Sequence, residues 1–216
     1  MKKLYPHFVC ILVLIFFSGY ANDSSWKLAV DKDGIKVYTR PAPGCPLDEF
    51  MATAEIDASA ATIEKILRDV DAQPDWMADC LHAKVLKIFD MNHMVCYNVL
   101  NLPWPLSDRD LLIDTIIVKS ADGKKFSFEM SAFPDDIIPL DSRYVRIRDF
   151  RARCIVEEVR PGTCAVVYIN RVNPMAPVPD AIANGIARNN PFNTLKGMKK
   201  MVQLDTYRDK QVNTSY

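Results

Sequence analysis

The sequence of 216 residues predicts an α+β fold, in which a curved antiparallel β-sheet wraps around one long C-terminal α-helix. Two observations lead to this prediction. Short segments of strand character follow one another between residues 83 and 172, and turn dipeptides such as Asp122-Gly123 and Pro161-Gly162 separate several of them. A single helical stretch, from Pro179 to about Arg208, is long enough to cover the apolar face of such a sheet.

The first 21 residues have the features of a secretory signal peptide. Lys2 and Lys3 precede an uninterrupted apolar run of ten, Phe8 to Phe17, and small residues stand at Gly19 and Ala21. The run is too short to span a membrane as a helix, and an uncleaved N-terminal anchor is the alternative. We therefore expect residues 1–21 to be removed and residues 22–216 to form a single domain, periplasmic or secreted.

Composition argues against a nucleic-acid partner. Without Lys2 and Lys3, 25 basic residues remain against 27 acidic ones, a net charge of −2. A nucleic-acid-binding domain normally carries a basic excess. We expect a monomer.

Five cysteines remain after the signal peptide, an odd number that leaves at least one free thiol. They are Cys45, Cys80, Cys96, Cys154 and Cys164. The last two flank the turn at Pro161-Gly162, where a two-residue loop places them on different rungs of a hairpin, so we expect no bridge between them. Buried free thiols behave as small apolar groups.

Two strands and a helix are predicted before the main series of strands. Gly34–Arg40 alternates between apolar and polar residues, and Phe50–Ile56 also has strand character. Ala58–Asp69 has helical periodicity, with Asp57 or Ser59 as the N-cap.

Seven strands and the terminal helix follow. The strands are predicted at Ala83–Phe89, Met94–Asn101, Leu111–Val118, Lys125–Ala132, Tyr144–Phe150, Ala152–Val159 and Thr163–Val172. The apolar stripe of the helix consists of Ile182, Ile186, Leu195, Met198 and Val202. Asn189-Asn190-Pro191 is expected to kink or split this helix, because proline lacks an N–H and its ring clashes with the preceding turn.

Alternation along three strands separates an inner face from an outer one. On Leu111–Val118, Asp114 marks its set as the outer one, which leaves Leu111, Ile113, Thr115 and Ile117 inside. On the other two strands the inner sets are Phe126, Phe128, Met130 and Ala132, then Val145 and Ile147, with Arg146 and Arg148 outside. These inner sets are almost wholly apolar, as in an ordinary core.

A resemblance to a known family adds a function to this fold. The segment LPWPLSDRDLL (102–112) is similar to the P-(F/W)-P-x-S-x-R-D segment of StAR-related lipid-transfer (START) domains, especially those near phosphatidylcholine transfer protein. Two further segments, Asp69–Leu86 and Asn173–Lys200, resemble other parts of the family in the same order, and the similarity extends over about Trp26–Arg208. It implies a helix-grip fold with a hydrophobic tunnel and lipid binding or transport.

The same resemblance nominates ligand-binding residues. They are Met94, Cys96, Asn98, Leu100, Arg109, Leu111, Ile113, Thr115, Phe126, Phe128, Met130, Val145, Ile147, Ile182 and Ile186. Many family members carry a second tunnel arginine and an acidic partner, where this chain has the neutral Thr115 and Cys96. The tunnel is therefore expected to be more apolar than is usual in the family.

Arg109 lies between Asp108 and Asp110 at the mouth of a strand. A buried charge needs a partner, so we expect one of these carboxylates to pair with it and to pin the bend that Trp104 covers. Contact of Arg109 with a lipid phosphate or carboxylate is the alternative.

The expected activity is binding of a lipid and its carriage between membranes of the cell envelope, without a catalytic residue, metal or cofactor. Sterols, phospholipids and fatty acids are open as ligands. An enzyme on the same scaffold, of the cyclase or hydrolase type, and a lipid sensor are the alternatives.

The terminal helix and the loop Phe133–Ser142 are candidate gates. Ile137 and Ile138 in that loop are expected either to touch a membrane or to pack back on the domain, and Lys196, Lys199 and Lys200 either to favour an anionic surface or to be solvated.

Overall fold

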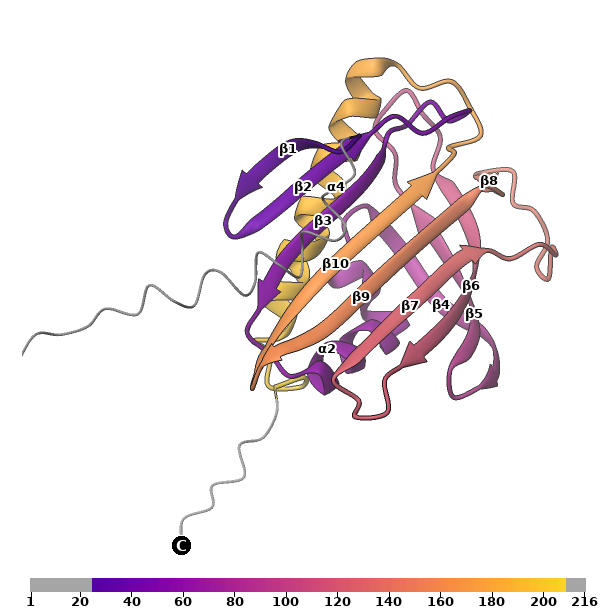
Figure 1. Ribbon diagram of the computed structural model, residues 1–216. Helices are drawn as coiled ribbons and strands as arrows, with labels where there is room; N and C mark the ends of the chain where they lie inside the picture. The colour runs from indigo at the N-terminus through magenta and orange to yellow at the C-terminus, as the bar shows by residue number, and fades with distance from the viewer. Residues whose placement is uncertain (1–24, 209–216) are drawn as a thin grey trace, which may run out of the picture.

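The computed structural model describes residues 25–208, so the predicted signal peptide lies outside the described residues. A ten-stranded sheet curves around one long helix (Figure 1). The elements are β1 (Lys27–Lys32), β2 (Ile35–Arg40), β3 (Glu49–Ile56), α2 (Ala60–Arg68), the 3₁₀ turn η1 (Val70–Ala72), α3 (Gln73–Trp76), β4 (Cys80–Asp90), β5 (His93–Leu100), β6 (Arg109–Lys119), β7 (Lys125–Ala132), β8 (Val145–Ile147), β9 (Phe150–Arg160), β10 (Thr163–Val172) and α4 (Asp180–Met201).

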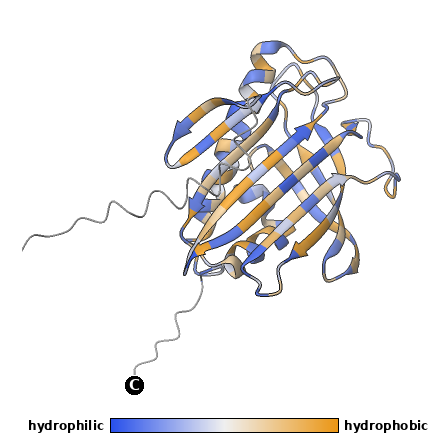
Figure 2. Ribbon diagram, viewed as in Figure 1, coloured by the Kyte–Doolittle hydropathy of each residue, from blue (hydrophilic) through white to orange (hydrophobic). Residues whose placement is uncertain are grey.

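The sheet runs in the order β1-β2-β3-β10-β9-β7-β6-β5-β4, with antiparallel neighbours throughout. Helix α4 contacts β1, β2 and β3 and also α3, so it lies along the concave side (Figure 1). The α+β prediction with a gripped C-terminal helix is therefore confirmed. Apolar and polar residues alternate along the strands (Figure 2), which is the pattern of a sheet with one covered face.

Local signals in the sequence hold well at several points. Ser59 is the N-cap of α2, and its side chain accepts a hydrogen bond from the Thr62 N–H. On β6 the predicted inner set is buried, whereas Ile116 and Val118 of the outer set are exposed. All five cysteines of the described chain are free. A β-bulge at Val159 on β9 places Cys164 opposite Glu158, and Cys154 pairs with Tyr168, so the two cysteines lie on different rungs.

The structure differs from the predicted elements at three points. Strand β1 was not predicted. The stretch Tyr144–Phe150 is not one antiparallel strand: β8 covers only Val145–Ile147 and pairs in parallel with the start of β6. Helix α4 is one continuous element with Pro191 inside it, so the predicted split was wrong, whereas the alternative, a kink, stays a prediction. Burial of Pro191 and of the following Thr194, Leu195 and Met198 holds the two halves in one helix.

A buried ion pair fixes the outer face at the start of β6. Arg146 points outward, as predicted, but it is buried. Its Nε and Nη2 donate to the two carboxylate oxygens of Asp110 at 2.9 and 2.8 Å. Its Nη1 donates to Asp136 at 2.9 Å, and Asp136 also accepts from Arg148. The loop between β7 and β8 is thereby held down on the sheet, where Ile138 packs against an outer cluster that includes Tyr97 and Leu112.

Close packing of α4 on α3 depends on Gly197. A Cβ atom at this position would lie 2.1 Å from the backbone oxygen of Trp76, far inside van der Waals contact. We expect Gly197→Ala to lower the free energy of unfolding by about 1–3 kcal/mol, because α4 or α3 must shift to admit the methyl group. Gly185→Ala, on the same helix with no atom within 4 Å, is the matched control. In chemical denaturation it should be neutral or stabilising by up to about 1 kcal/mol, and equal effects for the two changes would contradict this packing.

Candidate functional site

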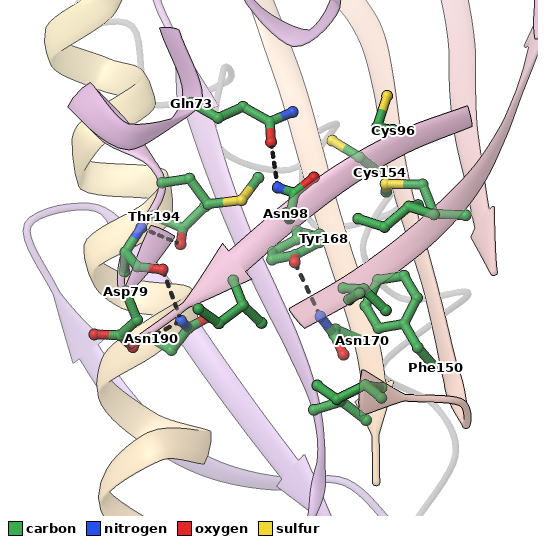
Figure 3. Close-up of a pocket in the computed structure, with 18 of the residues that line it drawn as sticks. Gln73, Asp79, Cys96, Asn98, Phe150, Cys154, Tyr168, Asn170, Asn190 and Thr194 are labelled. Atoms are coloured by element: carbon green, nitrogen blue, oxygen red, sulfur yellow. Dashed lines mark hydrogen bonds between the residues drawn. The ribbon is translucent and has the colours of Figure 1, made fainter. Parts of the chain in front are cut away.

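A cavity of about 130 Å³ lies between the concave face of the sheet and α4. This is roughly ten times the space that a single buried water needs, so the interior is not solidly packed. Strands β3, β5, β6, β7, β8, β9 and β10 supply one wall, and α4 with the α2–α3 segment supplies the other (Figure 3). Asp79 and Asn101 are the exposed residues of the wall, so the cavity reaches the surface between the turn before β4 and the loop after β5.

Twelve of the fifteen predicted ligand-binding residues line this cavity, and their contact with a ligand stays a prediction. They are Met94, Cys96, Asn98, Leu100, Arg109, Leu111, Ile113, Thr115, Phe128, Met130, Ile147 and Ile186. Alternation along β5 and β6 places eight of them there, because every second side chain of these strands points to the concave side.

The other three predicted residues do not line it. Phe126 is buried in the core and packs edge-on against Phe128, with ring centroids 5.9 Å apart. Val145 is half-buried on β8 and does not line the cavity, which β8 reaches only through Ile147. Ile182 packs in a separate apolar cluster with Leu47 and Val178 around the start of α4.

Further wall residues were not predicted as site residues. They are Leu47, Phe50, Leu67, Val70, Gln73, Trp76, Met77, Ala78, Asp79, Asn101, Leu102, Phe150, Cys154, Tyr168, Asn170, Val172, Pro174, Asn190, Thr194, Leu195 and Met198. The alternation of β9 and β10 and the apolar stripe of α4 carried a signal for Cys154, Asn170, Leu195 and Met198. The residues of α3 and of the loops carried none, because their approach depends on tertiary contacts.

Apart from Arg109 and Asp79, the polar side chains on the wall are neutral, and several of them are held by one another. Asn98 Nδ2 donates to Gln73 Oε1 at 2.7 Å, and Asn170 Nδ2 donates to the Tyr168 hydroxyl at 3.0 Å (Figure 3). Burial raises the pKa of the Cys96 and Cys154 thiols, and that of the Tyr168 hydroxyl, to about 12. These groups are therefore uncharged at neutral pH, and the thiols are poor nucleophiles.

Three buried atoms on the wall have no hydrogen-bond partner among the described residues: Trp76 Nε1, Asn98 Oδ1 and Asn170 Oδ1. Buried polar groups are almost always paired in folded proteins. Because all three residues line the cavity, from α3, β5 and β10, hydrogen-bonding capacity is left open around it.

At the mouth, hydrogen bonds connect α4 to the turn before β4. Asn190 Nδ2 donates to the Ala78 carbonyl at 3.1 Å and to Asp79 Oδ2 at 2.9 Å, and Thr194 Oγ1 accepts from the Ala78 N–H at 3.2 Å (Figure 3). Separation of α4 from this turn would break all three bonds.

Arg109 is buried on the wall, but it has no carboxylate partner within ion-pair distance in residues 25–208. Its Nε donates to the Pro174 carbonyl at 2.8 Å and its Nη1 to the Ser107 carbonyl. The expected pairing with Asp108 or Asp110 was therefore wrong: Asp110 pairs with Arg146, and the carboxylate of Asp108 accepts from the Leu102 N–H. Burial lowers the pKa of Arg109, against the opposing effect of the Asp108 charge.

The pinning role predicted for Arg109 is nevertheless present, since it connects the loop after β5 to the loop after β10. Trp104, at the tip of the first loop, is 89% exposed and does not cover the bend as expected. The second predicted gate, Phe133–Ser142, contributes no residue to the cavity wall and packs on the outer face.

Metal binding and membrane insertion are two further possibilities on which the described residues bear. None of the described His, Cys, Asp and Glu side chains gather in groups suited to a metal ion. Between residues 25 and 208, no helix is long and apolar enough to cross a membrane.

The chain is similar to proteins that carry a START domain. The START domain family matches residues 17–208. An uncharacterised protein of Pseudomonas aeruginosa, PA1579, is 30% identical over 186 residues, which cover 86% of this chain and 91% of that protein. Human ceramide transfer protein is 25% identical over 204 residues, and there the match covers only 33% of the relative's length and 86% of this chain.

Solved structures agree with this similarity. A STAR-related lipid transfer protein from Xanthomonas axonopodis superposes with a TM-score of 0.75 at 31% identity, over 83% of this chain and 99% of that one. Human STARD10, at 18% identity and a TM-score of 0.73, covers 87% of this chain and 76% of its own and shares the helix-grip fold. Because the family match extends over most of the chain, this protein belongs to the START domain family.

Proposed function

We propose that this protein binds one lipid in the cavity between its sheet and α4 and carries it between membranes of the cell envelope. The observation that carries the proposal is the cavity itself, with its mostly apolar and neutral wall. Names of the similar proteins support it, since they include a ceramide transfer protein and a STAR-related lipid transfer protein.

An apolar cavity suits carriage for a simple energetic reason. Each CH₂ group gains about 0.8 kcal/mol when it leaves water, so a sixteen-carbon chain would cost on the order of 13 kcal/mol to expose. Transfer from a bilayer into an apolar cavity avoids most of this cost. Four flexible methionine side chains, Met77, Met94, Met130 and Met198, line the wall and can adapt to acyl chains.

Binding without chemistry is the form we propose. Both cavity thiols remain protonated at neutral pH, with pKa values near 12, and this disfavours nucleophilic catalysis by cysteine. A cyclase or hydrolase would instead convert the bound lipid, and mass analysis of lipid recovered from the protein would detect the product.

The membrane-facing end is proposed to be the pair of loops pinned by Arg109. Trp104 and Met175 are exposed, one on each loop, and the bases of both loops reach the cavity wall at Leu102 and Pro174. Tryptophan is favoured at membrane interfaces because an apolar ring there carries a polar N–H. Lipid would leave or enter at this end once α4 separates from Ala78 and Asp79.

We expect Trp104→Ala to slow lipid transfer between donor and acceptor vesicles about tenfold. The reason is that one large apolar side chain no longer enters the membrane, and its contribution to membrane binding is lost. Retention of bound lipid in the absence of vesicles should not change. Ile88→Ala is the matched control. Ile88 is 68% exposed, but it lies at the end of β4 that is far from the loop after β5. Equal transfer rates for all three proteins would remove the loops from the proposal.

A further inference from the structure

Three buried polar atoms without a partner all belong to residues of the cavity wall. Trp76, Asn98 and Asn170 are 5%, 1% and 8% exposed, and Trp76 Nε1, Asn98 Oδ1 and Asn170 Oδ1 make no hydrogen bond within the described residues. Leaving one such group unpaired lowers the equilibrium constant for folding or binding roughly 5- to 150-fold. A ligand that supplies the missing bonds would recover this loss, and an apolar ligand would not.

The three groups require hydrogen-bond partners of a particular kind on the ligand. The Trp76 indole N–H can only donate a hydrogen bond, so it needs an acceptor on the ligand. Asn98 and Asn170 each use their Nδ2 on a neighbour, Gln73 and Tyr168, and leave the oxygen free to accept. Since an amide can turn over and exchange its two ends, each Asn can meet either a donor or an acceptor. Hydroxyl and carboxamide groups both donate and accept, and so can satisfy any one of the three positions.

Away from Arg109, a charged head group would fit this wall poorly. Arg109 and Asp79 are the charged side chains among the described wall residues. Two of the guanidinium nitrogens of Arg109 already donate to the carbonyls of Pro174 and Ser107, and Asp79 is exposed at the mouth, where it accepts from Asn190. A phosphate or carboxylate accepts hydrogen bonds but donates none when ionised, and away from Arg109 it would be buried without a counter-charge.

We propose that the ligand is a lipid whose polar part is uncharged and bears a hydroxyl or carboxamide group, recognised by Trp76, Asn98 and Asn170. This inference rests on the proposed lipid binding and adds the chemical class of the ligand. In this role the three side chains discriminate between lipids, whereas the apolar wall holds any acyl chain.

A matched ligand series tests the proposal on the unaltered protein. Oleyl alcohol, oleamide, methyl oleate, oleate and 1-octadecene share an eighteen-carbon chain and differ in the polar end. Their affinities can be compared by displacement of a fluorescent alkane from the cavity. We expect the alcohol and the amide to bind about tenfold or more tightly than methyl oleate and octadecene, on the scale of one or two recovered hydrogen bonds.

Variants identify the groups responsible. Asn170→Leu nearly keeps the side-chain volume, Trp76→Phe keeps an aromatic ring, and both remove the polar atom. The preference for the alcohol over octadecene should therefore fall about tenfold while octadecene binds at least as well. Asn193→Leu, exposed on α4 and away from the wall, should leave the preference unchanged. Retained octadecene binding also shows that each variant is folded.

Two results would overturn the ligand class while lipid binding stands. One is equal affinity across the series, which would mean that water already satisfies the three groups. The other is tightest binding of oleate, abolished by Arg109→Met, which would identify an anionic lipid. Failure of every member of the series to bind, octadecene included, would instead overturn the proposed function.

Discussion

Replacement of Asp110 by Ala should lower the free energy of unfolding by about 3–5 kcal/mol, the largest stability effect that we expect from a single change. The side chains of Asp110 and Arg146 are 2% and 5% exposed and share two hydrogen bonds, at 2.9 and 2.8 Å. Without Asp110, the buried guanidinium keeps only Asp136, whose side chain is 38% exposed. The Tyr97 hydroxyl would also lose its acceptor, at 3.3 Å.

Chemical denaturation measures this effect, and the chain offers two controls. Asp141→Ala removes a similar ion pair, with Arg143, from the exposed part of the same loop, where solvent screens it, and should change stability little. Asp110→Leu combined with Arg146→Met removes both charges and should cost far less than Asp110→Ala alone, because no buried charge is left unpaired. If Asp110→Ala and Asp141→Ala had equal effects, Arg146 would have to be solvated without its partner.

Replacement of Cys154 by Trp should abolish lipid binding, which is the largest functional effect that we expect. Cys154 is buried on the wall, opposite Phe128 on β7 and Tyr168 on β10. An indole ring at this place would occupy space that the lipid needs. The cost in stability should stay near 1–3 kcal/mol, the range for added volume in a core, since part of the ring enters empty space.

Cys154→Ala is the matched control, because it removes the same thiol and leaves the cavity open. It should retain lipid at the wild-type level when both proteins are incubated with vesicles, re-isolated and extracted. Retention of lipid by a folded Cys154→Trp protein, verified by circular dichroism and denaturation, would place the ligand elsewhere.

Periodicity in the sequence predicted most of the sheet, and the failures have physical causes. The alternation of Leu111, Ile113 and Thr115 identified the concave face of β6, because residues two apart share a face whatever the partner strand is. Val145 and Ile147 show the same alternation, but a short parallel strand and an antiparallel one have the same pattern. The pairing of β8 with β6 is a long-range choice that no local signal records.

Arg109 shows why a sequence neighbour need not be a structural partner. Adjacent residues in a strand point to opposite faces, so Asp110 faces outward to Arg146 while Arg109 faces the cavity. The partners of Arg109 are backbone carbonyls, Pro174 and Ser107 among them, which every residue carries and which give no compositional signal. The wall residues Gln73 and Trp76 were missed for a related reason, since α3 is a single turn placed by its contacts with α4 and β4.

Native mass spectrometry of the protein purified from its own host tests the central claim, that the space between the sheet and α4 holds one lipid. We expect the wild-type protein to carry an added mass equal to a single lipid, lost on denaturation and absent from Cys154→Trp. If the wild-type protein has only its bare mass after purification and also after incubation with lipid vesicles, the cavity is not a lipid site and this account of the protein is wrong.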